Sequence, residues 1–319
     1  MGFARFAAGR LAVALLTLVI IAVVVFAAMR AIPGSYADTL LGPQASPEAR
    51  AAMTAKYGLE DPAIVQFGRW IGSAATGDLG TSLTSGDPVL SELGSRAAVT
   101  AELAVLGGAL ALLVGVPLGL LGGMARSRRR LGLVRVGNSV LLSAPDILVG
   151  AVLVWLISTY EVPFTVGTWT PLTADPLANL QGALPAALTV AILGMGFVMT
   201  TTRGAVAEAL EQPYVHAATA RGATRGQIVR RHVLRNASVP VLTVFAVYLG
   251  YLLGGAVIAE VLFSLDGIGR YVVEAAGHRD YPVVQGAVLA SALAFVLINM
   301  LVDLLYGVID PRIGARAGA

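Results

Sequence analysis

The chain has 319 residues, of which 56% are hydrophobic and only 13% are charged. A water-soluble protein of this length carries about a quarter charged residues, so the composition excludes an ordinary soluble enzyme or binding domain. Cysteine is absent, which excludes disulfides and thiolate metal sites. We attribute the net charge of +3 to arginines in cytoplasmic loops of a membrane protein rather than to a nucleic-acid partner.

Six segments are apolar and long enough to span roughly 30 Å of hydrocarbon as helices. The first could also be a signal peptide, because Arg5 and Arg10 precede it, but its length favours a retained helix. Pro145 interrupts the third segment. The six predicted spans are residues 11–29, 97–124, 136–159, 183–202, 237–263 and 283–308. The sequence therefore predicts an all-α integral membrane protein with six transmembrane helices.

The distribution of basic residues predicts the orientation of these spans. With the N-terminus in the cytoplasm, fifteen of the 22 Lys and Arg residues fall on the inner side. This asymmetry follows the positive-inside rule and predicts that both termini are cytoplasmic. The chain then divides into a first transmembrane helix (1–30), an extracytoplasmic segment (31–96) and a five-helix core (97–319).

The extracytoplasmic segment contains two helix signals. Ser46 and Pro47 fit an N-cap and a first helical position, and residues 62–75 have the pattern of an amphipathic helix. About 65 residues are few for an independent core, so we interpret this segment as a cap packed on the membrane helices.

Small residues recur at every fourth position in two spans. They are Gly115, Gly119 and Gly123 in the second span, and Gly250 and Gly254 in the fifth. Such faces allow helices to approach closely in lipid. We expect packing within the chain more than an interface with another subunit.

The sequence contains no recognisable catalytic motif. A P-loop needs a lysine after a glycine-rich run, and the only lysine, Lys56, follows no such run. The three histidines, His216, His232 and His278, lack the spacing of metal ligands. We therefore predict a protein that is not an enzyme by itself and that binds neither metal nor cofactor.

The most informative stretch is the basic segment 203–236 between the fourth and fifth spans, which contains six arginines. Pro213 fits the first position of a short helix, and Gly222 fits its left-handed C-terminal residue. Thr224 and Gln227 have the spacing of a capping box that starts a second helix. A solvated basic loop near anionic lipid is the alternative. The paired start and stop signals favour an ordered helix–turn–helix that binds a soluble partner.

This segment resembles a known family. Residues 216–222, His-Ala-Ala-Thr-Ala-Arg-Gly, resemble the EAA-xxx-G motif of permease subunits of binding-protein-dependent ABC importers. Tyr214 and Val215 before it, and His-Val-Leu-Arg-Asn at 232–236, are similar to the dipeptide/oligopeptide/nickel permease family. His216 replaces the glutamate of the broader motif, and Thr219 an arginine common in the peptide branch. Further resembling blocks are residues 41–48, 57–62, 77–80, 254–260, 267–270, 280–286, 302–306 and 310–312.

The resemblance implies the ABC type-1 importer transmembrane domain in a bacterial cytoplasmic membrane. A second homologous permease would complete the pathway, two ATPase subunits would bind ATP and Mg, and an extracytoplasmic binding protein would deliver substrate. Peptides are the first expectation for the substrate, and nickel or another metal chelate and glutathione are alternatives. A secondary transporter or a membrane scaffold would need no ATPase. The residues expected to couple to the ATPase are Tyr214, His216, Ala217, Ala218, Arg221, Gly222, Gln227 and Arg231.

Acidic residues in or near the spans are costly in lipid and are candidates for function. Glu102, Asp146 and Glu260 are expected at the translocation pathway or its gate, and Glu260 is the first choice. Asp146 stands where the family commonly has serine. An interhelical hydrogen bond is the structural alternative for each acid. Asp303 is expected to anchor the last helix.

Overall fold

The computed structural model describes residues 2–31, 41–42, 45–56, 60–125 and 127–309. Within these residues, five helices are long and apolar enough to cross a membrane, and a bent pair of helices forms a sixth candidate span. This confirms the predicted all-helical membrane fold. The chain forms two compact units. One comprises chiefly Met1–Ala98 with Asp266–Leu297, and the other chiefly Val99–Leu265 with Ile298–Ala317.

The second unit is built around helix α8 (Pro176–Leu210), whose most apolar stretch is mostly buried within the chain. Asp175 caps its N-terminus by accepting hydrogen bonds from the amides of Leu177 and Ala178. The helices α5 (Val89–Gly123, from Val99 onward) and α11 (Leu234–Leu262) pack against α8. The buried core they share includes Leu103, Ala187, Val190, Met195, Leu252 and Phe263.

The glycine repeat of α5 lies against α8. A Cβ atom added to Gly119 would lie 2.5 Å from Cβ of Thr202 and 2.8 Å from the carbonyl oxygen of Met199. Gly115 and Gly123 meet α8 in the same way one turn to either side. These distances confirm that the repeat serves close packing within the chain. Gly254, in the second predicted pair, lies outside the side chains that the structure describes.

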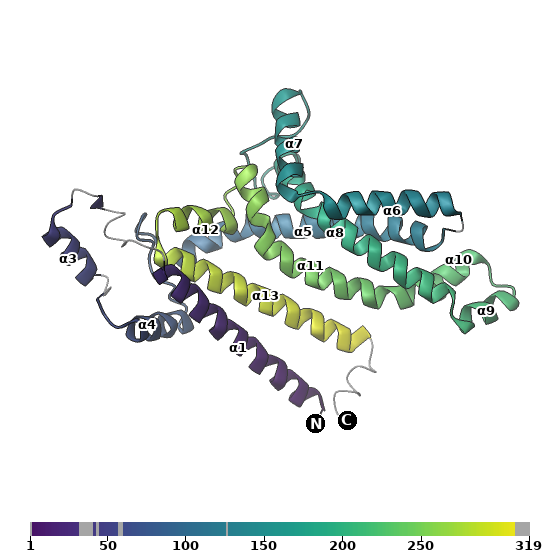
Figure 1. The fold of residues 1–319 in the computed structure, drawn as a ribbon, viewed down its shortest axis with the longest axis horizontal. Helices are drawn as coiled ribbons and strands as arrows, with labels where there is room; N and C mark the ends of the chain where they lie inside the picture. The colour runs from purple at the N-terminus through teal and green to yellow at the C-terminus, as the bar shows by residue number, and fades with distance from the viewer. Residues whose placement is uncertain (1, 32–40, 43–44, 57–59, 126, 310–319) are drawn as a thin grey trace. The chain divides into compact units, whose positions relative to one another are not determined.

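The third predicted span consists of two helices, α6 (Arg128–Ser143) and α7 (Asp146–Thr159), which are bent by 90° relative to each other. Figure 1 shows α7 turning away from the line of α6. Pro145 causes the break, because proline lacks an amide donor and restricts the preceding residue to extended backbone. Ala144 accordingly has φ −74° and ψ 118°. The predicted break is confirmed, and its sharpness was not predicted.

The first unit has its own core, formed by residues such as Val25, Leu79, Val89, Leu93, Ala275 and Val283. The amphipathic helix predicted at 62–75 is confirmed as α4, whose Phe67 ring meets Phe26 of α1 edge-on and whose Trp70 ring stacks on it. The predicted helix start at Ser46 is also confirmed, because its hydroxyl accepts from the amide of Ala49. The helices are α1 (Gly2–Ala31), α3 (Pro47–Lys56), α4 (Ala63–Ala75), α12 (Ile268–Gly277) and the start of α13 (Tyr281–Ile309).

Two features of this unit were not predicted. The second span begins at Val89 instead of residue 97, and α12 was not predicted.

Asp280, which is 2% exposed, accepts hydrogen bonds from the Ser82 hydroxyl at 2.6 Å and the Thr84 amide at 3.1 Å. These bonds hold the turn before α5 against the start of α13.

Candidate functional site

The loop after α8 begins with helix α9 (Pro213–Ala220), which ends as the sequence predicted. Gly222 has φ +83°, a left-handed conformation that strains any residue with a Cβ. Its amide donates to the carbonyl of Thr219 at 2.9 Å, and the amide of Ala223 donates to the carbonyl of Ala218 at 3.1 Å. This pair of bonds is the Schellman motif, and it turns the chain sharply out of α9.

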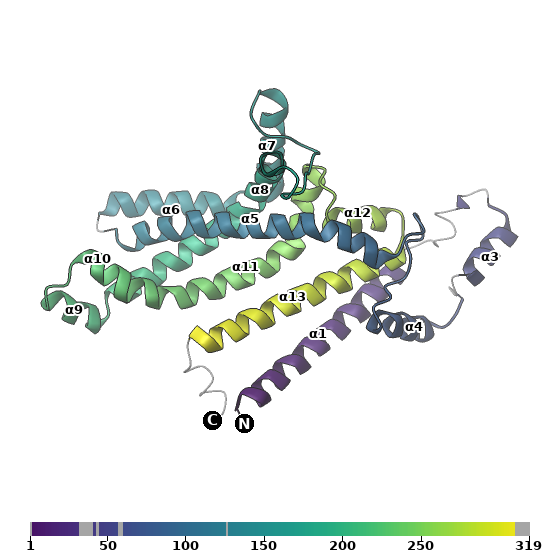
Figure 2. The ribbon, with the colours of Figure 1, turned by 180° about the vertical axis from the view of Figure 1, so that it is seen from behind.

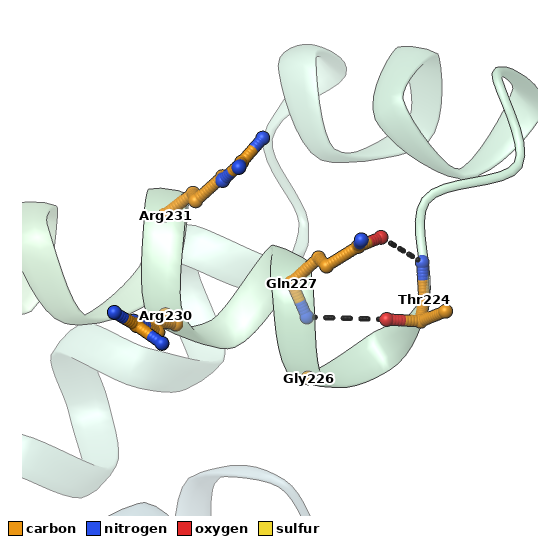
Figure 3. Close-up of a pocket in the computed structure, with 5 residues that line it drawn as sticks. All are labelled: Thr224, Gly226, Gln227, Arg230 and Arg231. Atoms are coloured by element: carbon orange, nitrogen blue, oxygen red, sulfur yellow. Dashed lines mark hydrogen bonds between the residues drawn. The ribbon is translucent and has the colours of Figure 1, made fainter.

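The predicted capping box is confirmed at the start of helix α10 (Arg225–Ile228). The Thr224 amide donates to Oε1 of Gln227 at 2.9 Å, and the Gln227 amide donates to Oγ1 of Thr224 at 3.4 Å (Figure 3). Both bonds satisfy amides that would otherwise lack a partner at the helix start. The turn between α9 and α10 is therefore fixed from both sides.

The second helix of the loop is not a separate element. After α10, a π-helical stretch, η1 (Val229–Val233), leads without a break into α11. Figures 1 and 2 show α9 and α10 at one end of α8 and α11. A displacement of α10 is therefore a displacement of the end of α11. The sequence held no signal for the π-helical stretch.

A small hydrophobic core fastens this loop to the membrane helices. Val215, Ala218, Ile228 and Val233 are buried, together with Val206, Ala209 and Ala237. Leu120 and Met124, at the end of α5, pack against this cluster. The guanidinium of Arg225 donates to the carbonyl of Met124 at 2.9 Å. The loop thus contacts the ends of α5, α8 and α11. Ala218, one of the predicted coupling residues, is buried in this core and not exposed on the loop surface.

Most of the other predicted coupling residues lie on the exposed side of the loop. His216, Ala217, Arg221 and Gly222 are exposed. Tyr214 is 37% exposed, and its hydroxyl accepts from the Asn236 amide group at 2.9 Å. A groove is lined by Thr224, Gly226, Gln227, Arg230 and Arg231, and the two arginines leave the backbone in different directions (Figure 3).

Two of the predicted membrane acids form hydrogen bonds between elements. Glu260 is fully buried on α11 and accepts from the Thr100 hydroxyl of α5 at 2.7 Å. Glu102 is half-buried on α5 and accepts from the indole of Trp169 at 2.8 Å. Both acids therefore stabilise packing within the second unit.

Asp146 lies at the break between α6 and α7 and is half-buried. Its Oδ2 accepts from the hydroxyl of Tyr251 at 2.9 Å. The Tyr251 ring stacks on Tyr248, with the ring centroids 6.2 Å apart. Tyr248 is buried and donates to the carbonyl of Val190 at 2.6 Å, so this ring pair is held in place. The side chain of Asp303 lies outside the described residues.

The hydrogen-bond partners of these acids were not predicted. Thr100 and Tyr251 are polar residues within predicted spans. Their position in a span could have indicated hydrogen bonds to the acids of neighbouring helices. Trp169 lies in a loop and gave no signal. Arg225 was predicted only as part of the basic charge of the loop. In the structure its guanidinium also binds the carbonyl of Met124 at the end of α5.

Five or six candidate membrane spans and an ordered polar loop after α8 define a multi-pass helical membrane protein as the class. Residues 115–315 match the model for the inner membrane component of binding-protein-dependent transport systems, and residues 3–104 match its N-terminal membrane component. The chain belongs to this family of ABC permeases, as predicted, and is a multi-pass inner membrane protein.

The relatives are similar over nearly their whole length. The dipeptide transport system permease protein DppB of Alkalihalophilus pseudofirmus is 34% identical, covering 97% of this chain and 98% of that protein. The glutathione transport system permease protein GsiC of Salmonella typhimurium is 34% identical, covering 93% and 94%. A chain of the methionine ABC transporter MetNI in an inward-facing conformation is 22% identical, with a TM-score of 0.48, covering 70% of this chain and 95% of that chain.

Proposed function

We propose that this chain is the permease subunit of an ATP-driven ABC importer for di- or oligopeptides. The observation that supports it most is the 34% identity to a dipeptide permease along almost the full length of both chains. A second relative is named a glutathione permease, and glutathione is itself a short peptide. The chain is the membrane subunit of the importer, and ATP and Mg bind to partner ATPase subunits.

The loop α9–α10 is the element that couples ATP hydrolysis to transport. Its exposed residues, His216, Ala217, Arg221 and Gly222 among them, present small and basic side chains to a cleft of an ATPase. Tyr214, Gln227 and Arg231 complete this surface. Because the loop is joined to α5, α8 and α11 by a buried core, closure of the ATPases moves these helices with it. The helices then alternate between inward-facing and outward-facing arrangements.

A second, homologous permease completes the translocation pathway, and an extracytoplasmic binding protein delivers the substrate. Asp146 and Glu102, which are half-buried, face this pathway. Glu260 does not contact the substrate but supports the pathway wall, since its buried carboxyl joins α11 to α5. The extracytoplasmic segment forms a cap, and both termini lie in the cytoplasm.

Affinity purification from native membranes tests this assignment. The tagged chain, solubilised in a mild detergent, should bring down a second six-span permease and one or two P-loop ATPases, identified by mass spectrometry. Recovery of the chain alone, active in transport without ATP, would favour a secondary carrier. Recovery of the ATPases with a binding protein that selects a metal chelate would keep the importer and change its substrate.

A further inference from the structure

Within the described residues, no charged side chain pairs with the Asp146 carboxylate. Its Oδ2 accepts from Tyr251, but within the described residues its Oδ1 has no hydrogen-bond partner and no Lys or Arg forms an ion pair with it. An acid at membrane depth is costly and normally faces a partner, a cavity or a pathway. Glu260, by contrast, is fully buried against Thr100.

The surroundings of Asp146 suit a cation. Tyr251 is 42% exposed, so its ring lies beside the carboxylate at the surface of the unit. An aromatic face attracts a cation, and an adjacent carboxylate adds charge attraction. Tyr248 fixes the Tyr251 ring from behind, because it is buried, stacked on Tyr251 and bonded to α8. A Cβ at Gly194 would overlap the Tyr248 ring, which leaves that ring no room to move toward α8.

The pair also lies at a break between the two helices of one candidate membrane span. Asp146 begins α7 at the 90° break, where the chain between α6 and α7 is not helical. Interrupted membrane helices commonly form substrate sites in transporters.

We propose that Asp146 and Tyr251 form a cation subsite in the pathway, which binds the ammonium group of the substrate. The carboxylate pairs with the ammonium, and the Tyr251 ring contacts it from one side. The pair discriminates between substrates with and without a positive end. This inference rests on the proposed importer function for its substrate, whereas the existence of a water-filled, cation-selective site can be tested without transport.

Thiol labelling tests the site itself, because the chain has no cysteine of its own. Val247 is 67% exposed one turn before Tyr251 on α11, so Val247→Cys places a single thiol beside the intact pair. We expect a cationic methanethiosulfonate reagent to react faster than an anionic one. Adding Asp146→Asn should lower that ratio of rates about fivefold, the scale of a partly exposed ion pair. An unchanged ratio, or reaction only with a membrane-soluble maleimide, would overturn the proposal.

Transport then tests the ligand. The complete importer in proteoliposomes is given one peptide with a free N-terminus and the same peptide N-acetylated. Asp146→Asn should lower the ratio of the two uptake rates about threefold to fivefold, and the exposed-loop control Glu161→Gln should leave it unchanged. The same binding protein serves all variants, so its selectivity cancels. If the ratio stays the same while less of the second permease co-purifies, the carboxylate pairs with that subunit and the proposal fails. Absence of ATP-dependent uptake in the wild type would contradict the importer function and leave the labelling result standing.

Discussion

Substitution of Gly222 separates two possible roles of the turn between α9 and α10. Gly222 has φ +83°, and a Cβ added there would meet nothing within 4 Å in this chain. Within the chain, Gly222→Ala therefore costs only the left-handed backbone strain, about 1–2 kcal/mol. Asn tolerates this conformation, so Gly222→Asn adds bulk with less strain. Gly222→Asp adds bulk and a negative charge.

If the turn enters a cleft of an ATPase, bulk should matter more than strain. We expect all three variants to insert and fold, and we expect Gly222→Asn and Gly222→Asp to hydrolyse ATP without peptide uptake. Gly277→Asp is the matched control, since Gly277 is exposed, helical and equally unobstructed, and it lies in α12, outside the loop. Uptake and ATP hydrolysis are measured together in proteoliposomes. Normal uptake by Gly222→Asp would show that the turn does not enter such a cleft. Loss of uptake already in Gly222→Ala would assign the effect to the backbone strain.

Three further predictions concern the elements that hold the loop and the turn at residues 82–88 in place. Gly119→Leu should destabilise the α5–α8 contact by about 3 kcal/mol and lower the yield of folded protein. Gly137→Leu should do neither, because a Cβ at Gly137 would have no atom within 4 Å, and thermal unfolding in detergent compares the two variants. Thr224→Ala and Gln227→Ala should each cost about 1 kcal/mol, and their double variant less than the sum, because the two share one capping box; additive costs would contradict this. Asp280→Ala should leave buried donors unpaired, cost about 2 kcal/mol and increase hydrogen exchange at residues 82–88, and unchanged exchange there would argue against the assigned contacts.

Much of the candidate loop could be predicted because its signals are local. The left-handed conformation of Gly222 and the pairing of Thr224 with Gln227 depend on residues within one or two turns. The same holds for the break at Pro145, which follows from the missing amide. The glycine repeat of α5 predicted close packing correctly, since a helical spacing places small residues on one face.

What could not be predicted depends on contacts distant in sequence. Arg225 bonds to a carbonyl 101 positions earlier, and Glu260 bonds to Thr100 across 160 positions. No local pattern specifies such partners. The continuous path from α10 through η1 into α11 was also missed, because a π-helical turn arises from the packing around it and has no sequence signature.

ATP-dependent uptake by the purified assembly tests the central proposal most directly. Proteoliposomes that contain this chain, its co-purifying permease and ATPases are loaded with ATP and Mg, and a labelled dipeptide is added outside with the binding protein. We predict accumulation that requires ATP and the binding protein, and that stops when the ATPase partner is inactivated. Accumulation that persists without ATP hydrolysis would contradict it.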